Sequence, residues 1–208
     1  MNNETTLIIL AGGKSSRMGQ SKGLLNYKER FWILYQIENY IGSEVFIGLG
    51  FDAHLYFEAI PWLEKALTTP QLHLDKKVQV VINPTPEFGV FSTLQSVLKV
   101  LDCAPVHKDV LILPIDVPLI NSTELGKILN EENRIVIPKH KNKNGHPVKL
   151  APEFWKTLLE LKVRDENSRL DFQIKKRVPS EISYVEINDS AILKNLNSPA
   201  DWQEFINS

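Results

Sequence analysis

The chain has 208 residues, of which 43% are hydrophobic and 24% charged, with 24 basic and 25 acidic side chains. This composition excludes a mainly disordered chain and predicts a single globular domain spanning residues 1–208. The net charge of −1 and the absence of a long basic stripe argue against a nucleic-acid partner. The single cysteine, Cys103, excludes an intrachain disulfide and a thiolate zinc site, and we expect it to be buried or half-buried.

Neither a secretion signal nor a membrane span is expected. Residues 1–4 contain no basic region followed by an apolar core. The apolar run at residues 7–11 is too short to cross a bilayer. The sequence therefore predicts a cytoplasmic protein without a membrane partner.

Short apolar runs alternate along the chain with segments whose apolar residues recur at helical spacing. Strands are expected at residues 5–10, 44–47, 78–82, 110–113, 134–137, 148–150 and 183–187. Helices are expected at residues 31–41, 55–67 with a restart at Pro61, 91–101, 122–130 with a Ser or Thr cap, 152–161, 169–176 and 199–206. Residues 68–77 are expected to form a loop. The alternation predicts an α/β fold with an open, mainly parallel sheet, in which 148–150 is a candidate antiparallel strand.

In such sheets ligands bind beyond the carboxyl ends of the strands. The loop after the first strand contains Gly12 and Gly13, whose backbone can approach a ligand closely, and the cations Arg17 and Lys22. This combination predicts a phosphate-binding loop, although it matches neither the P-loop nor the dinucleotide pattern. The alternative is an ordinary glycine-rich turn with solvated charges.

The full loop, LAGGKSSRMGQSKGLL, closely resembles the signature loop of the molybdenum-cofactor nucleotidyltransferases, which include molybdopterin guanylyltransferases and cytidylyltransferases. The resemblance implies a three-layer, Rossmann-like nucleotidyltransferase fold with a mainly parallel, mixed sheet. It also implies transfer of a nucleoside monophosphate from a triphosphate to a phosphorylated acceptor such as molybdopterin, with Mg²⁺ as cofactor and pyrophosphate as the second product. The family places the nucleotide against the positions of Leu10, Ala11, Gly12 and Gly13, with Arg17 and Lys22 holding the phosphates.

Two later segments resemble the family's nucleotide and metal motifs. Asn83-Pro84 and the turn at 88–94 resemble the second nucleotide-binding segment, and an ordinary loop with an N-cap at Ser92 is the alternative. Asp116, in LILPIDVPL, matches the family's metal-binding aspartate in its D-x-P-L setting. A single carboxylate at the end of a strand suits Mg²⁺, which takes its other ligands from phosphates and water. A capping or turn role for Asp116 is the alternative.

Three further segments extend the resemblance along the chain. Gly145-His146-Pro147 resembles the acceptor-side segment, so His146 either contacts the acceptor or pins a turn. Residues 163–169 loosely resemble another acceptor-side segment, which surface charge explains equally well. Asn195-Leu196-Asn197-Ser198-Pro199 resembles the closing motif, in which the position of Asn197 can complete the metal site. A helix cap at Asn197 or Ser198 is compatible with that role.

Different features of the sequence imply different bases for the nucleotide. The pair Gly12-Gly13 resembles the guanylyltransferase branch and implies GTP, whereas the short spacing to Lys22 and the Gly-His-Pro segment resemble the cytidylyltransferase branch and imply CTP; GTP is slightly preferred. Two alternatives to this enzyme are a sugar-phosphate nucleotidyltransferase and a non-catalytic nucleotide-binding protein on the same fold. Trp202 and Phe205 in the last helix are expected to cap the core.

Overall fold

The computed structural model describes residues 5–207. Residues 1–4, on which the expectation about a secretion signal rests, lie outside the described residues, as does residue 208. In the part of the chain that is described, no helix is long and apolar enough to cross a membrane.

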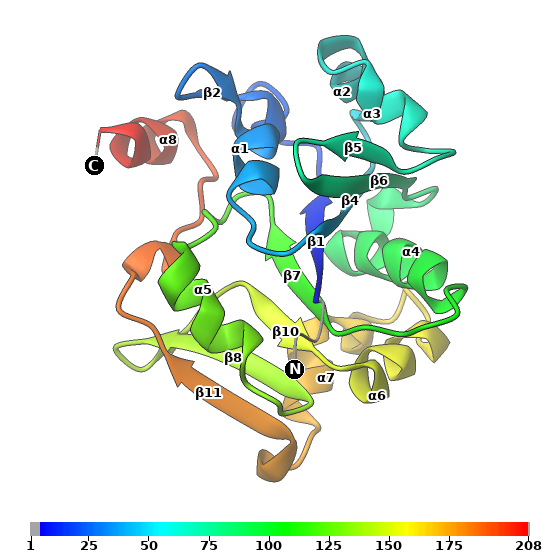
Figure 1. The fold of residues 1–208 in the computed structure, drawn as a ribbon, viewed down its shortest axis with the longest axis vertical. Helices are drawn as coiled ribbons and strands as arrows, with labels where there is room; N and C mark the ends of the chain where they lie inside the picture. Colours follow the sequence, from blue (N-terminus) through cyan, green and yellow to red (C-terminus); the bar gives the residue numbers. More distant parts are fainter. Residues whose placement is uncertain (1–4, 208) are drawn as a thin grey trace.

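A sheet of nine strands runs through the centre of residues 5–207 in the order β11-β8-β10-β7-β1-β4-β6-β5, with β9 paired to β8 (Figure 1). The strands are β1 Thr6–Ala11, β4 Glu44–Leu49, β5 Gln71–His73, β6 Lys76–Ile82, β7 Val110–Pro114, β8 Ile135–His140, β9 Lys143–Asn144, β10 Val148–Leu150 and β11 Ile182–Glu186. β1, β4, β6 and β7 are mutually parallel, and β11 is parallel to β8. β10 is antiparallel to both of its neighbours. The expected mainly parallel, mixed sheet is confirmed.

Helices cover both faces of the sheet. They are α1 Trp32–Glu38, α2 Ala53–Ala59, α3 Trp62–Lys65, α4 Val90–Asp102, α5 Ser122–Leu129, α6 Pro152–Trp155, α7 Leu170–Lys175 and α8 Pro199–Ile206. Leu7 and Ile9 of β1 pack into the core shared with α1, α2, α3, α5 and α8, whereas Ile8 and Leu10 pack into the core shared with α4 and α6. Because successive side chains of a strand point to opposite faces, a strand covered on both sides needs an unbroken apolar run. The result is the expected three-layer α/β fold.

The structure differs from several local expectations. Within the segment 68–77, which was expected to be a loop, residues 71–77 form β5, the turn and the start of β6, so that the expected strand at 78–82 is one arm of a hairpin. The N-cap of α5 is Asn121, whose side chain accepts a hydrogen bond from the Glu124 amide, and not a Ser or Thr. The helix expected at 152–161 is α-helical only to Trp155 and continues as a 3-10 turn. Cys103 is exposed, because it lies at the C-terminal end of α4 beyond the face that packs on the sheet.

The last helix, α8, closes one side of the molecule. In Figure 1 it lies beside α1 and a small hairpin of β2 (Asn26–Tyr27) and β3 (Arg30–Phe31), which the sequence did not predict. The Trp202 ring meets the Trp32 ring edge-on, with centroids 5.4 Å apart, and Phe205 stacks on Tyr27. The terminal helix therefore caps the core, as expected.

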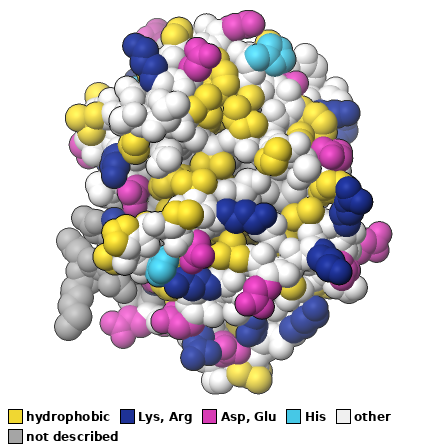
Figure 2. Space-filling model, turned by 90° about the vertical axis from the view of Figure 1, so that its right-hand side faces the viewer, with side chains coloured by type: hydrophobic (Ala, Val, Ile, Leu, Met, Phe, Trp, Pro, Cys, Tyr) yellow, Lys and Arg dark blue, Asp and Glu magenta, His cyan; other side chains and the backbone are white. Residues whose placement is uncertain are grey.

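One face of the molecule, shown in Figure 2, carries basic and acidic side chains in alternation with hydrophobic ones among them. On this face neither sign of charge forms a continuous patch of the kind that a duplex-binding protein presents.

Candidate active site

The loops that the sequence singled out meet at one edge of the sheet. β1 and β7 are adjacent and parallel, with Leu10 in register with Pro114. The Ile115 amide donates a hydrogen bond to the Leu10 carbonyl at 3.0 Å, so the chain leaves both strands together. Asp116 is therefore placed directly beside the start of the glycine loop. This arrangement follows from parallel pairing, which brings the carboxyl ends of strands to one edge.

The glycine loop, residues 11–22, is held by its own contacts. Ser15 and Gly19 have positive φ values of 49° and 75°, which turn the backbone sharply. Met18 is buried and its amide bonds to the Ser15 carbonyl at 2.9 Å, so it anchors the middle of the loop. The Lys22 amide then donates to Ser15 Oγ at 3.2 Å. These contacts fix the position from which the Lys22 side chain starts.

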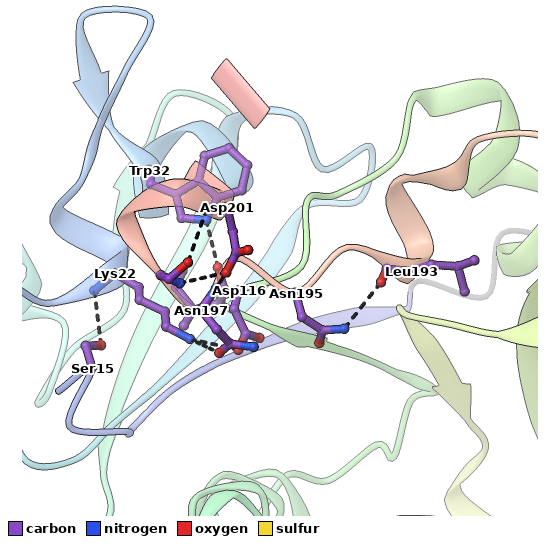
Figure 3. A network of polar contacts seen from close by, with 10 residues as sticks. Ser15, Lys22, Trp32, Asp116, Leu193, Asn195, Asn197 and Asp201 are labelled. Carbon is purple, nitrogen blue, oxygen red and sulfur yellow. Dashed lines mark hydrogen bonds and ion pairs between the residues drawn. The ribbon is translucent and has the colours of Figure 1, made fainter. Parts of the chain in front are cut away.

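Lys22 joins the three parts of the site. Its ammonium Nζ lies 2.9 Å from Asp116 Oδ2 and 2.7 Å from Asn197 Oδ1. Figure 3 shows the Lys22 side chain reaching both acceptors from the loop side. The Leu196 amide donates to the Asp116 carbonyl at 2.8 Å, which holds the C-terminal segment against the end of β7. Of the residues that the sequence placed in the site, Lys22 thus lies within hydrogen-bond distance of both Asp116 and Asn197.

The start of α8 leaves Asn197 available to this site. Ser198, and not Asn197, is the N-cap, and Asp201 completes a capping box with it. The Ser198 and Asn197 amides donate to Asp201 Oδ2 at 2.8 and 3.1 Å. The cap and the site therefore use neighbouring residues, and the Asn197 side chain points to Lys22.

Arg17 lies on the same side of the molecule. Its side chain is exposed and makes no hydrogen bond or ion pair within residues 5–207. The pKa of Asp201 is lowered first by the hydrogen bond from the Ser198 side chain, then by backbone hydrogen bonds, and least by the charge of Arg17. An exposed guanidinium near the start of α8 can contact anionic oxygens of a ligand.

The donor set fits a divalent ion that takes most of its ligands from phosphate and water. Asp116 and Asn197 each direct one side-chain oxygen toward a single position, which a cation, the Lys22 ammonium, fills. Across residues 5–207 no group of three or more His, Cys, Asp or Glu side chains could hold a metal ion. One carboxylate and one amide oxygen resemble the sparse protein ligation that Mg²⁺ shows in phosphate-transfer sites.

Asn83 links two elements next to the glycine loop, because its partner Thr93 lies against Gly12. It is 2% exposed, and its Nδ2 donates to Ser92 Oγ at 2.7 Å and to Thr93 Oγ1 at 3.0 Å. Its Oδ1 accepts from the Thr85 amide at 2.9 Å. These bonds tie the end of β6 to the first turn of α4. Direct contact of Asn83 with a nucleotide remains a prediction.

A cavity of about 1200 Å³ opens beside Asp116 and extends over the sheet face between α4 and α7. Its floor is apolar, with Ile112, Val148, Ile137 and Ile182 coming from β7, β10, β8 and β11. Its far rim carries Arg169, Lys175 and Arg177. The sequence indicated only Arg169, through the segment 163–169. The run of basic residues at 175–177 is the one feature of the sequence that could have indicated the rest, but its place beside the cavity depends on how α7 packs.

His146 lines the near end of this cavity. Its amide donates to the Ile192 carbonyl at 3.0 Å. A Cβ at Gly145 would lie 2.4 Å from the same oxygen, so this close approach requires glycine. Burial lowers the pKa of His146, and the nearby Asp116 carboxylate raises it by less. The ring is therefore neutral at pH 7 and suited to a polar contact, not to charge neutralisation.

Comparison with known proteins gives consistent results. The family model described as the MobA-like NTP transferase domain matches residues 7–178. A molybdenum cofactor guanylyltransferase from Campylobacter jejuni is 27% identical over 98% of this chain and 96% of its own length. The crystal structure of Rv0371c from Mycobacterium tuberculosis superposes with a TM-score of 0.75 at 17% identity, covering 100% of both chains. A structure of the same mycobacterial protein in complex with manganese gives a TM-score of 0.70 at 16% identity, covering 99% of each chain.

Proposed function

Since the chain belongs to the MobA-like NTP transferase family, we propose that it transfers GMP from GTP to the phosphate of molybdopterin and releases pyrophosphate. The observation that supports this most directly is the meeting of Lys22, Asp116 and Asn197 beside the glycine loop and at the mouth of the cavity. The loop provides a place for the triphosphate, and the cavity provides a place for the acceptor.

The reaction needs positioning and charge stabilisation more than proton transfer. An oxygen of the acceptor phosphate forms a bond to the α-phosphorus of GTP while the bond to the β-phosphate oxygen breaks, and pyrophosphate leaves. The attacking phosphate oxygen is already ionised at pH 7, so no general base is required. A neutral His146 agrees with this, because the step asks for no imidazole to take up a proton.

The side chains of the site supply the stabilisation. Lys22 and Arg17 would hold the β- and γ-phosphates and neutralise the charge of the departing pyrophosphate. Asp116 and Asn197 would hold a divalent ion, Mg²⁺ in our proposal, which offsets negative charge on the phosphate oxygens. The backbone of residues 10–13 would face the nucleoside and the α-phosphate, and Gly13 is exposed there.

GTP is proposed as the donor on two grounds. The chain has the Gly12-Gly13 pair, and the relative from Campylobacter jejuni is named a guanylyltransferase. The low identity of that relative leaves CTP as the base to test against.

The cavity favours an acceptor larger than a sugar phosphate. It crosses β7, β10, β8 and β11, which are consecutive in the sheet. Three interstrand spacings of about 4.8 Å give a width of about 14 Å. An apolar floor of that width would bind the flat rings of a pterin, whereas the hydroxyl groups of a sugar would find few partners on it.

The test is pyrophosphate release from GTP, CTP, ATP and UTP with Mg²⁺, using molybdopterin or a sugar 1-phosphate as acceptor, with the product identified by mass spectrometry. We expect GTP with molybdopterin to give the highest kcat/KM. Asp116→Ala should lower kcat by about two to three orders of magnitude, as when one preorganised electrostatic group is removed from a transition state. Asp75→Ala is the matched control, because Asp75 lies in the exposed β5–β6 hairpin.

Each result has a clear meaning. Faster turnover with CTP would contradict the assignment of the base, and faster turnover with a sugar 1-phosphate would contradict the acceptor. Near-normal activity of Asp116→Ala would remove Asp116 from the metal site. A wild-type protein that binds GTP without releasing pyrophosphate under any of these conditions would be a binding protein.

A further inference from the structure

The Lys22 ammonium occupies the position to which the site's oxygens point. Its Nζ is bonded to Asp116 Oδ2 and Asn197 Oδ1, which lie 94 and 175 residues further along the chain. The Lys22 side chain is only 13% exposed and that of Asp116 23%, so this contact is largely withdrawn from water. In Figure 3 dashed lines run from the end of Lys22 to both acceptors. These two oxygens therefore already bind a cation, the Lys22 ammonium.

A divalent ion cannot share this position with the ammonium. Mg²⁺ binds oxygen ligands at about 2.0–2.1 Å, so an ion held by both oxygens would overlap the space that Nζ fills. The two positive charges would also repel each other at such a short separation. Either the ammonium or the ion can bind the side-chain oxygens of Asp116 and Asn197, but not both in the same place.

The acid closest to Asn197 along the chain is already engaged elsewhere. The Asp201 carboxylate, the nearest acid along the chain, is bonded to the Asn197 and Ser198 amides at the start of α8. The Lys22 backbone is fixed to Ser15 Oγ, but its four-carbon stem can swing without moving the loop. A triphosphate in the glycine loop would offer Nζ new anionic partners and would bring phosphate ligands for the ion.

We propose that Lys22 is a placeholder cation whose displacement by the nucleotide opens the metal position. This inference rests on the proposed function for the identity of the displacing ligand. The nucleotide-free protein then binds divalent ions weakly, because each ion must first expel the ammonium. Nucleotide and metal binding become coupled, since the phosphates draw Lys22 away while the ion takes its place.

The test is direct measurement of Mn²⁺ binding to nucleotide-free protein, by electron spin resonance of free Mn²⁺ or by calorimetry. Removing a catalytic lysine should here improve metal binding. We expect Lys22→Met to bind Mn²⁺ at least about tenfold more tightly than wild type, within the usual range of coupling between two ligands. Adding Asp116→Asn to Lys22→Met should abolish that gain, because the ion would lose its only carboxylate.

Lys14→Met is the matched control. It removes the same charge from the same loop, but Lys14 Nζ lies over the Phe51 ring, 4.5 Å from its centroid, and not between the oxygens. Its Mn²⁺ affinity should change by less than about threefold, as expected for a partly screened charge. Lys22→Gln keeps a polar end of similar length, so it provides a second neutral variant whose folding can be compared by thermal unfolding.

Equal or weaker Mn²⁺ binding by both neutral Lys22 variants would overturn the placeholder role. The same result together with normal wild-type transfer from GTP would leave the proposed function intact. Conversely, tighter Mn²⁺ binding by the variants, with no wild-type transfer from any triphosphate, would support the placeholder and reject the proposed function.

Discussion

Gly12 lies where the structure leaves no room for a side chain. A Cβ at this position would be 2.4 Å from Thr93 Oγ1 and 3.1 Å from Thr93 Cγ2. Thr93 cannot easily move, because it is 2% exposed and its Oγ1 accepts a hydrogen bond from Asn83. At Gly13, in contrast, a Cβ would meet nothing within 4 Å. Packing alone thus accounts for glycine at 12, whichever base is bound, and it is Gly13 that has open space beside its backbone.

Gly12→Ala should therefore destabilise the protein without any ligand. We expect a loss of about 1–3 kcal/mol, the usual cost of an extra carbon in a packed core. The loss should shrink when Thr93 is also changed to Ala, because both clashing atoms are then gone. Urea unfolding of the two single variants and the double variant measures this coupling. Gly13→Ala is the control, expected within about 0.5 kcal/mol of wild type; an equal loss at both glycines would contradict the packing explanation.

At the scale of elements, buried strands were predictable and tight hairpins were not. The runs that became β1, β4 and β7 are apolar because both of their faces are covered, and this pattern can be recognised in the sequence. The hairpin β2–β3 turns at Lys28 and Glu29, which have φ values of 49° and 65°, and β5–β6 turns at Leu74, with φ 53°. Glycine or asparagine normally marks such positions. Their absence here left these turns without a signal.

In the candidate site, too, one part of the arrangement could be predicted from the sequence and another part could not. The sequence resemblance brought Lys22, Asp116 and Asn197 together, and their proximity follows from strand order and the return of the C-terminal segment. That Lys22 binds both of the other side chains depends on side-chain geometry, which no motif encodes. The far rim of the cavity, with Lys175 and Arg177, depends on the packing of α7, for which the sequence offered only a charge cluster.

The start of α8 carries a prediction about pH. The Ser198 hydroxyl and the backbone hydrogen bonds lower the pKa of Asp201 in the folded chain. The folded state therefore binds this proton more weakly than the unfolded state, and the stabilisation by Asp201 is present above the unfolded pKa of about 3.9. It is lost as the pH falls through the lower folded value. Wild type should melt at a higher temperature than Asp201→Asn at pH 7, and the difference should disappear toward pH 2–3. A difference that stayed constant with pH would rule out this origin.

At the scale of the whole molecule, the antiparallel strand β10 joins two halves of the sheet. On one side lie β7, β1, β4 and β6, whose carboxyl ends carry the glycine loop and Asp116. On the other lie β8 and β11, which form the far floor of the cavity. His146 stands just before β10 and Asp116 just after β7. The relative position of Asp116 and His146 therefore depends on how firmly β10 is held.

A buried ion pair holds β10 in place. Lys149, 2% exposed, lies 3.2 Å from Asp109 Oδ2 and donates to the Leu129 and Glu131 carbonyls, so it ties β10 to the start of β7 and the end of α5. Asp109→Asn would leave the ammonium buried without its counter-charge and should cost about 3–5 kcal/mol. Lys149→Met should cost less, because Asp109 is 12% exposed and can still reach water, while methionine fills the space of the lysine stem.

The double variant Asp109→Asn/Lys149→Met distinguishes the effect of the buried charges on stability from the effect of side-chain volume. It contains neither charge, so its stability in urea should exceed that of Asp109→Asn alone, with an unchanged m-value if the sheet still unfolds as one unit. A double variant no more stable than Asp109→Asn would mean that the carboxylate acts on β7 independently of Lys149. The two halves of the sheet would then be joined by strand pairing and apolar packing alone, and mutations at this pair should leave the alignment of Asp116 and His146 unchanged.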